Sequence, residues 1–190
     1  MLPSVIKTSK SGAQACDIIS AEYEKRRIYL TGTINENSAA EVVAQINYLA
    51  DLSDEDITII IQSGGGSVTA GYAILDAMAG SGCDISTVVN GIAASMAAVI
   101  AVAGTKGKRF IGKFSEMMIH QPLAGAEGQA SDIERVATHL LNTKKQLNEL
   151  LSEYTGQSYE VICRDTDRDY YMGAAAAVNY GLCDAVFEGF

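Results

Sequence analysis

The chain has 190 residues, of which 48% are hydrophobic and 19% are charged. A chain of this length buries roughly 70% of the surface that its unfolded form exposes, so we predict a single domain over residues 1–190 without structural disulfides or metals. The 23 acidic and 14 basic residues give a net charge of −9, and no basic run occurs, which argues against nucleic acid as a partner.

Membrane and secreted proteins are also disfavoured. The longest uncharged apolar run, residues 92–103, is too short to cross a bilayer. The N-terminus lacks the basic and apolar regions of a secretory signal, so we predict a cytoplasmic protein. The cysteines lie far apart without a CxxC pair, which predicts reduced thiols and no metal site: Cys16, Cys83, Cys163 and Cys183.

The first predicted elements are a strand, a helix and a second strand. Residues 27–30 predict a short strand that ends in a turn at residues 31–32. A helix with capping-box spacing at residues 38–41 follows. Its buried face is predicted from three residues at helical spacing: Val42, Ile46 and Leu49. The β-branched residues 57–61 predict a strand covered on both sides, which ends in the glycine-rich turn 63–66.

Two βαβ units are predicted next. A helix over residues 67–79 leads into a strand over 85–89. Asn90 and Gly91 then predict a turn, followed by a tightly packed helix over residues 92–102. Two further strands complete this part, near residues 108–111 and 115–119.

The C-terminal part is mainly helical. Residues 129–154 predict the longest helix, which ends at the C-capping Gly156. Short helices near residues 159–163 and 173–180 and a strand near 182–186 follow. The alternation of strands and helices predicts an α/β fold.

Ser95 is the first candidate for chemistry. It follows a predicted strand and turn and lies among small residues near the start of a helix. The free N–H of Met96 can donate to an oxyanion that forms when Ser95 attacks a carbonyl. A serine in an alanine-rich helix also packs or bonds back to a carbonyl, so that alternative stays open here.

The glycine run 64–66 is the second candidate. Three glycines leave backbone amides uncovered, and such amides bind an oxyanion or a phosphate. Phosphate is the weaker alternative because neither GxxxxGK[ST] nor GxGxxG is present. A plain turn is the third alternative.

A base and a carboxylate complete the candidates. His120 follows a predicted strand and is the better candidate for a general base, because His139 lies within the long helix, where a solvated histidine is expected. One carboxylate could orient His120. Spacing alone does not choose among Asp165, Asp167 and Asp169.

Four motifs resemble the ClpP family, the proteolytic subunits of Clp ATP-dependent proteases. They occur in the family's order and spacing: residues 63–71 (SGGGSVTAG), 91–98 (GIAASMAA), 118–122 (MIHQP) and 165–170 (DTDRDY). The likeness runs from about Val5 to the C-terminus. It implies a ClpP/crotonase-like α/β fold of repeated ββα units with a long protruding handle helix.

The resemblance implies roles for particular residues. Ser95 matches the nucleophile, His120 the base and Asp169 the third member of a Ser-His-Asp triad. The backbone amides of Gly66 and Met96 match the oxyanion hole. The positions that match the substrate-binding strands are listed here: Gly66, Ser67, Val68, Pro122, Leu123 and Ala124.

The resemblance also implies an assembly. It implies two stacked seven-membered rings that enclose fourteen sites, in which unfolded polypeptides are cut by a serine endopeptidase. Residues 1–18 match an axial segment, about 121–155 a handle region that joins the rings, and Asp167 with Arg168 an ion-pair switch between them. No cofactor is implied in this subunit, because ATP is used by a partner AAA+ ATPase of the ClpX, ClpA or ClpC type.

Two departures from the family pattern affect these expectations. The family usually has proline where this chain has Gly64, which gives the oxyanion loop more freedom. It commonly has aromatics at Thr58, Ile60 and Gly80, so the pocket that receives the ATPase is expected to be aliphatic and shallower. A catalytically weak or structural ring subunit working with a second ClpP paralogue is therefore one alternative. A crotonase-type acyl-CoA enzyme is another.

Overall fold

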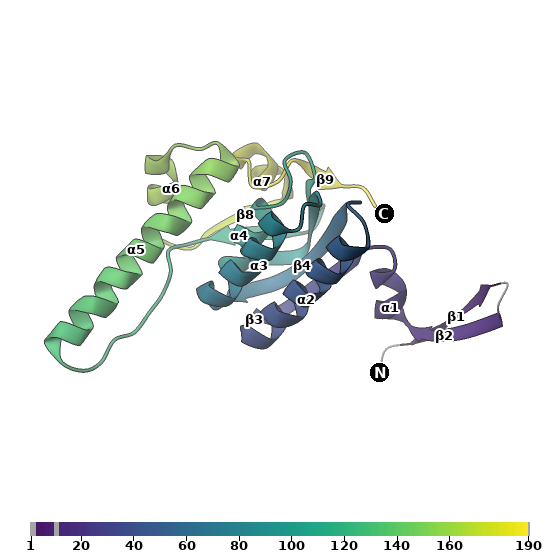
Figure 1. The fold of residues 1–190 in the computed structure, drawn as a ribbon. Helices are drawn as coiled ribbons and strands as arrows, with labels where there is room; N and C mark the ends of the chain where they lie inside the picture. The colour runs from purple at the N-terminus through teal and green to yellow at the C-terminus, as the bar shows by residue number, and fades with distance from the viewer. Residues whose placement is uncertain (1–2, 10–11, 190) are drawn as a thin grey trace.

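A hairpin and a short helix form the N-terminal part of the chain. The computed structural model describes residues 3–9 and 12–189. Strands β1 (Ser4–Ser9) and β2 (Gly12–Asp17) pair antiparallel and project from the body (Figure 1). Helix α1 (Ile18–Tyr23) follows, with the Asp17 side chain accepting from the Ser20 N–H. We predicted no element here, because mostly exposed strands carry no alternating apolar pattern. The assignment of residues 1–18 as an axial segment stays a prediction.

A parallel sheet forms the body, which confirms the predicted α/β fold class. Five of the seven strands in the described part of this sheet lie, in spatial order, as β3 (Arg27–Ile34), β4 (Ile57–Gly66), β5 (Ile85–Ala94), β6 (Arg109–Gly112) and β9 (Ala185–Phe187). The β-branched run in β4 is almost fully buried, as predicted for a covered strand.

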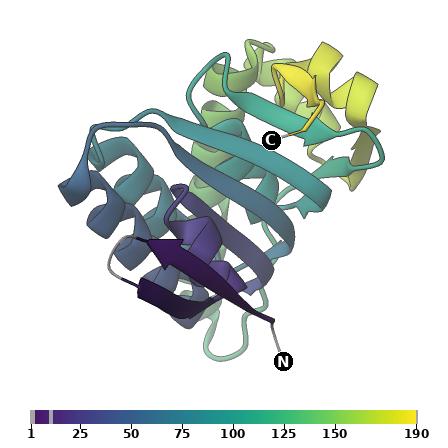
Figure 2. The same ribbon diagram turned by 90° about the vertical axis from the view of Figure 1, so that its right-hand side faces the viewer.

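Three helices pack side by side on the sheet (Figures 1 and 2). They are α2 (Glu36–Leu52), α3 (Val68–Gly80) and α4 (Met96–Val102). The predicted buried face of α2 is confirmed, but its predicted start is wrong. Asn35 is the N-cap, and Ser38 is the third helical residue, which bonds back to the Asn35 N–H. The capping box therefore begins three residues earlier than the sequence pattern suggested.

Strand β5 is longer than predicted, and this decides where the site forms. Asn90 and Gly91 do not turn the chain, so the predicted helix over residues 92–102 begins only at Met96. The first half of β5 pairs with β6, and residues 92–94 pair with β7 (Glu116–Ile119). An unpredicted strand, β8 (Tyr170–Gly173), then pairs antiparallel with β7.

The long helix α5 (Ala130–Thr155) projects from the body on the side opposite the hairpin (Figure 1). Its C-cap Gly156 is left-handed, as predicted. Only its C-terminal half carries buried residues, because its N-terminal half leaves the body. Helix α6 (Tyr159–Asp165) packs against α5, and helix α7 (Ala174–Tyr180) packs against the strands at the C-terminal side of the sheet. In the part of the chain that the structure describes, no helix is long and apolar enough to span a membrane.

Candidate active site

Ser95 lies between the end of β5 and the start of α4. Its backbone has φ 56° and ψ −125°, a region that non-glycine residues rarely adopt. Its N–H donates to the carbonyl of Met118 on β7 at 2.8 Å. Such a conformation costs about 1–3 kcal/mol and persists only where the surroundings fix it. Here the strand and the helix on either side fix the turn, which carries a partly buried hydroxyl at the sheet edge.

His120 immediately follows β7. Because β7 runs parallel to β5 with Met118 beside Ala94, the residue after β7 comes close to the residue after β5. The Ser95 hydroxyl lies 2.8 Å from His120 Nε2. The His120 side chain is only 15% exposed, so the structure holds this nitrogen at the hydroxyl largely away from solvent.

Asp169 immediately precedes β8 and faces His120. The antiparallel register pairs Ile119 with Tyr170, so the next pair outward is His120 and Asp169. The Nδ1–H of His120 donates to Asp169 Oδ1 at 2.9 Å. With this tautomer, Nε2 is free to accept the proton of the Ser95 hydroxyl. The serine hydroxyl can thus pass its proton to Nε2, while Asp169 orients the imidazole through Nδ1.

The other candidate acids and the second histidine lie elsewhere. The side chain of Asp165 accepts from Arg164 Nε at 2.8 Å, a bond that lowers the pKa of this carboxyl, and from the Tyr180 hydroxyl. Asp167 is exposed and faces α5 rather than His120. His139 is exposed on α5, where it lines a groove between α3 and α5. Of the three aspartates, only Asp169 bonds to His120 in the described structure.

Two glycines allow close backbone contacts at the end of β4, Gly65 with Ser95 and Gly66 with Ile34 on β3. A Cβ atom on Gly65 would lie 2.6 Å from the Ala94 carbonyl oxygen and 2.8 Å from Ser95 Cβ. A Cβ on Gly66 would lie 2.1 Å from the carbonyl oxygen of Ile34, and both glycines have positive φ. Only glycine fits at these positions, so the β4 backbone approaches Ser95 closely at Gly65 and Ile34 closely at Gly66. Met96 starts α4, and its N–H therefore has no acceptor within the helix.

Gly64, where the resembling family usually has proline, is sterically unconstrained. Its φ lies outside the positive range, and an added Cβ would meet nothing within 4 Å. The loop is instead held by the buried Ser63 hydroxyl, which donates to the Gly32 carbonyl on β3 and accepts from the Gly65 N–H at 3.0 Å. These hydrogen bonds restrict the backbone of the loop, as a proline at residue 64 would.

A groove of about 350 Å³ lies between the start of α3, residues 122–124 and α5. Val68, Pro122, Leu123 and Ala124 line it, so four of the six predicted substrate-binding residues share one surface. The Ser67 side chain caps α3 by accepting from the Ala70 N–H, and its backbone N–H donates to the Ile34 carbonyl on β3 at 2.8 Å. Sequence reasoning missed Tyr72 and Leu140, which also line the groove, because their helical spacing indicates only packing.

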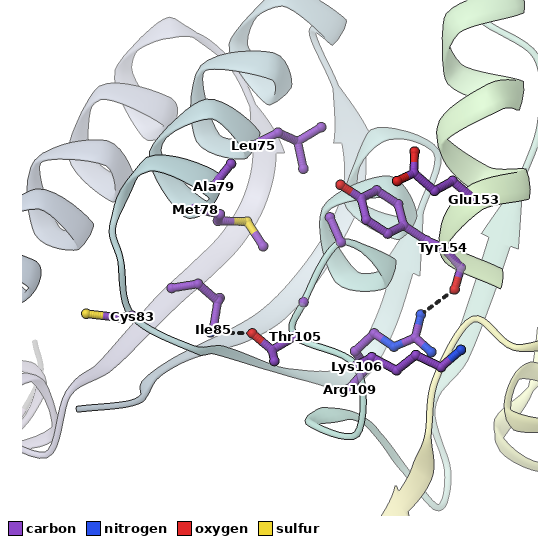
Figure 3. A pocket seen from close by; sticks show the side chains of 12 residues that line it. Leu75, Met78, Ala79, Cys83, Ile85, Thr105, Lys106, Arg109, Glu153 and Tyr154 are labelled. Carbon is purple, nitrogen blue, oxygen red and sulfur yellow. Dashed lines mark hydrogen bonds between the residues drawn. The ribbon is translucent and has the colours of Figure 1, made fainter. Parts of the chain in front are cut away.

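Other hollows lie away from the triad. One of about 380 Å³ is lined by Leu75, Met78, Arg109 and Tyr154, among others, and Figure 3 shows it. Two more are lined by the stacked rings of Tyr23 and Tyr48. Of the predicted ATPase-docking positions, Ile60 is only 4% exposed.

The described residues contain no group of three or more histidine, cysteine, aspartate or glutamate side chains that could hold a metal ion. The cysteines among them are free thiols, with Cys183 buried. Burial raises the pKa of the Cys183 thiol to about 12, so it is protonated at neutral pH.

Comparison with known proteins decides the family. The family model described as Clp protease matches residues 10–189. The chain is 47% identical over 189 residues to the ATP-dependent Clp protease proteolytic subunit of Ligilactobacillus salivarius (strain UCC118), covering 99% of this chain and 96% of that protein. The chain belongs to the Clp protease family. The resemblance inferred from the four sequence motifs is thus confirmed, and the family match includes every residue of the Ser95, His120 and Asp169 cluster.

Proposed function

We propose that this member of the Clp protease family is a serine endopeptidase that acts as the proteolytic subunit of an ATP-dependent Clp protease. One observation carries the proposal: His120 bonds to both Ser95 and Asp169, at 2.8 and 2.9 Å. This is the geometry of nucleophile, base and orienting carboxylate that acyl transfer requires. The family match and the name of the relative support proteolysis over acyl-CoA chemistry.

Acylation begins when the Ser95 hydroxyl attacks the carbonyl carbon of the scissile peptide bond. His120 Nε2 takes the hydroxyl proton as the new C–O bond forms, and Asp169 stabilises the resulting imidazolium. The same Nε2–H then protonates the leaving amine as the C–N bond breaks. The N-terminal part of the substrate remains as an ester on Ser95.

Deacylation repeats these steps with water. His120 accepts a proton from water, whose oxygen attacks the ester carbonyl, and returns a proton to Ser95 as the acyl group leaves. In both tetrahedral intermediates the carbonyl oxygen carries negative charge. The N–H groups of Gly66 and Met96 are assigned to stabilise this charge, and each such donor is worth about 10²–10³ in rate.

Substrate is proposed to lie extended between Gly66–Val68 and Pro122–Ala124. The groove between these segments is lined by Val68 and Leu123, which favours apolar side chains next to the scissile bond. A specific pocket is not needed for selectivity if the sites are enclosed, because folded proteins cannot then enter.

The assembly is proposed from the family likeness. Two stacked seven-membered rings would enclose the sites, with α5 joining the rings and Asp167 and Arg168 pairing across them. In the single chain, Arg168 Nη1 donates to the Asp167 carbonyl, the Asp167 carboxylate lies 3.8 Å from Lys144 Nζ, and both side chains are exposed. An AAA+ ATPase ring would supply unfolded polypeptide and consume the ATP, in the cytoplasm.

The test combines a variant with a mass measurement. Ser95→Ala should abolish both hydrolysis of a short fluorogenic peptide and labelling by a fluorophosphonate, while native mass stays that of two rings. Turnover that persists in this variant contradicts the serine mechanism. An assembled wild-type chain without turnover, which gains activity only when mixed with a second ClpP from the same source, would favour the structural-subunit alternative.

A further inference from the structure

Gln121, the residue after His120, is bonded to the segment that carries Asp169. Its N–H donates to the Thr166 carbonyl at 2.6 Å. Its Nε2 donates to the Asp167 carbonyl at 2.7 Å. These two bonds join the β7 and β8 segments just beyond the last ladder pair, on the side where His120 faces Asp169. They therefore fix the spacing of the two backbones from which those side chains extend.

Lys144 on α5 orients the Gln121 amide. Its Nζ donates to Gln121 Oε1 at 2.8 Å and lies 3.8 Å from Asp167 Oδ1. The Lys144 side chain is 29% exposed, so the contact is partly shielded from water. A hydrogen bond from a charged donor is stronger than a neutral one, and it holds the oxygen of the amide toward α5 and its nitrogen toward Asp167.

A second contact joins α5 to the same turn one helical turn further along. The Thr166 hydroxyl donates to Asn148 Oδ1 at 3.1 Å. Both side chains are buried, at 0% and 1% exposed. Asn148 therefore anchors the base of the turn, while Lys144 reaches its more exposed end at Asp167.

Asp169 depends on this support. Its side chain is 57% exposed, so packing contributes little to its position. The backbone on either side of it must hold the carboxylate at His120, and residues 166–167 on one side are held by α5 and Gln121. A displacement of about one ångström of such a catalytic group lowers the rate by up to about 10²-fold.

We propose that Lys144 is a positioning residue, which through Gln121 and Asp167 holds Asp169 at His120 and so couples α5 to the triad. The inference rests on the proposed serine-peptidase function. Any displacement of α5 moves Lys144 and is transmitted to the turn that carries Asp169. Lys144 does not line the substrate groove, so its loss acts on the chemical step and not on substrate binding.

The first experiment compares Lys144→Met, Lys144→Arg and a matched control, Lys145→Met. Lys145 is the next residue on α5, is 66% exposed and is 3.7 Å from Glu149. We expect Lys144→Met to lower kcat for a short fluorogenic peptide about tenfold with KM unchanged, the scale of one charged hydrogen bond. Lys144→Arg should recover most of the rate, because a guanidinium also donates to Gln121 Oε1. Lys145→Met should match wild type.

A double-mutant cycle tests whether the effect passes through Asp169. The rate of fluorophosphonate labelling is measured for Lys144→Met in the wild-type and the Asp169→Ala backgrounds. If Lys144 acts by placing Asp169, the tenfold effect disappears once the carboxylate is gone. The same factor in both backgrounds overturns the proposal.

Three further outcomes are decisive. If both Lys144→Met and Lys144→Arg fail to assemble to the native mass of wild type, Lys144 acts in assembly and the proposal is overturned. If the Ser95→Ala variant hydrolyses the peptide at the wild-type rate, the proposed function itself is contradicted. Ser95-dependent turnover that Lys144→Met leaves unchanged contradicts only the role of Lys144.

Discussion

Arg109→Met is expected to destabilise the fold by about 3 kcal/mol. Arg109 is 3% exposed and bonds to Asp184 through Nη2 at 2.6 Å and Nε at 3.0 Å. Its Nη1 also donates to the carbonyls of Val102 and Tyr154, and Figure 3 shows the second bond. Removing one partner of a buried pair costs about 3–5 kcal/mol. The lower end applies because the Asp184 side chain is 18% exposed.

The pH dependence of this loss has a definite sign. Burial alone would raise the pKa of Asp184, but hydrogen bonds from Arg109 hold this pKa below its usual value. The pair therefore contributes its stability above the unfolded pKa of about 3.9 and loses it as pH falls through the lower folded pKa. In the Arg109→Met variant, the Asp184 carboxylate is still partly buried but has lost its guanidinium partner. Protonation of Asp184 therefore stabilises the folded variant. The difference in unfolding free energy between wild type and variant should be largest near neutral pH and should become small below about pH 4.

Urea unfolding followed by circular dichroism measures both effects. Protein concentration is held fixed, because association shifts apparent stability. A 3 kcal/mol loss corresponds to a midpoint about 1–3 M lower for typical urea slopes of about 1–3 kcal/mol per M. Lys108→Met is the control, since Lys108 pairs with Asp56 and Asp84 at the surface and should leave the midpoint nearly unchanged. A wild-type midpoint in Arg109→Met, or a gap that does not vary with pH, would refute the reasoning.

Three further substitutions test the loop and the groove. Gly64→Ala should stabilise the protein by about 0.4–1 kcal/mol in urea unfolding with peptidase activity retained, because Gly64 has open space around its Cβ and no positive φ. Gly66→Ala should lower the rate of fluorophosphonate labelling by about 10²-fold or more, because its Cβ would meet the Ile34 carbonyl oxygen and displace the assigned oxyanion donor. Tyr72→Phe should raise the unfolding midpoint, because the buried Tyr72 hydroxyl has no hydrogen-bond partner within the described residues; a lower midpoint would show that this hydroxyl is satisfied.

Elements with a repeated buried face could be predicted from the sequence. The covered strand β4 and the amphipathic α2 and α3 lie where their apolar patterns indicate. Strand β5 was predicted too short because Asn90-Gly91 is a strong turn signal. In the fold, Gly91 has φ 85° inside a strand, and its N–H donates to the Ser115 hydroxyl at 2.8 Å. A tertiary contact thus converts a turn sequence into continuing strand.

The candidate site was predicted one residue at a time, but its geometry could not be. Ser95 and His120 stand out by type and by their place after predicted strands. The choice of Asp169 over its neighbours needed the family resemblance, because β8 is only four residues long and has no alternating apolar pattern that would predict its pairing. Its register with β7 is what sets Asp169 opposite His120. Likewise, nothing local marks Lys144, since its contact with Gln121 joins residues 23 positions apart.

The backbone at Ser95 and the glycines of β4 depend on each other. Ser95 keeps a positive φ only if its own N–H reaches Met118 and α4 starts at once, which brings the Ala94 carbonyl and Ser95 Cβ toward β4. A side chain at Gly65 would occupy the space between β4 and Ser95. A change in the backbone of either Gly65 or Ser95 would therefore separate the two residues. The strain at the nucleophile is therefore maintained by the same close approach that brings the β4 amides beside Ser95. For this reason a substitution at Gly65 should disturb the serine and its neighbouring donors together, whereas one at Gly64 should disturb neither.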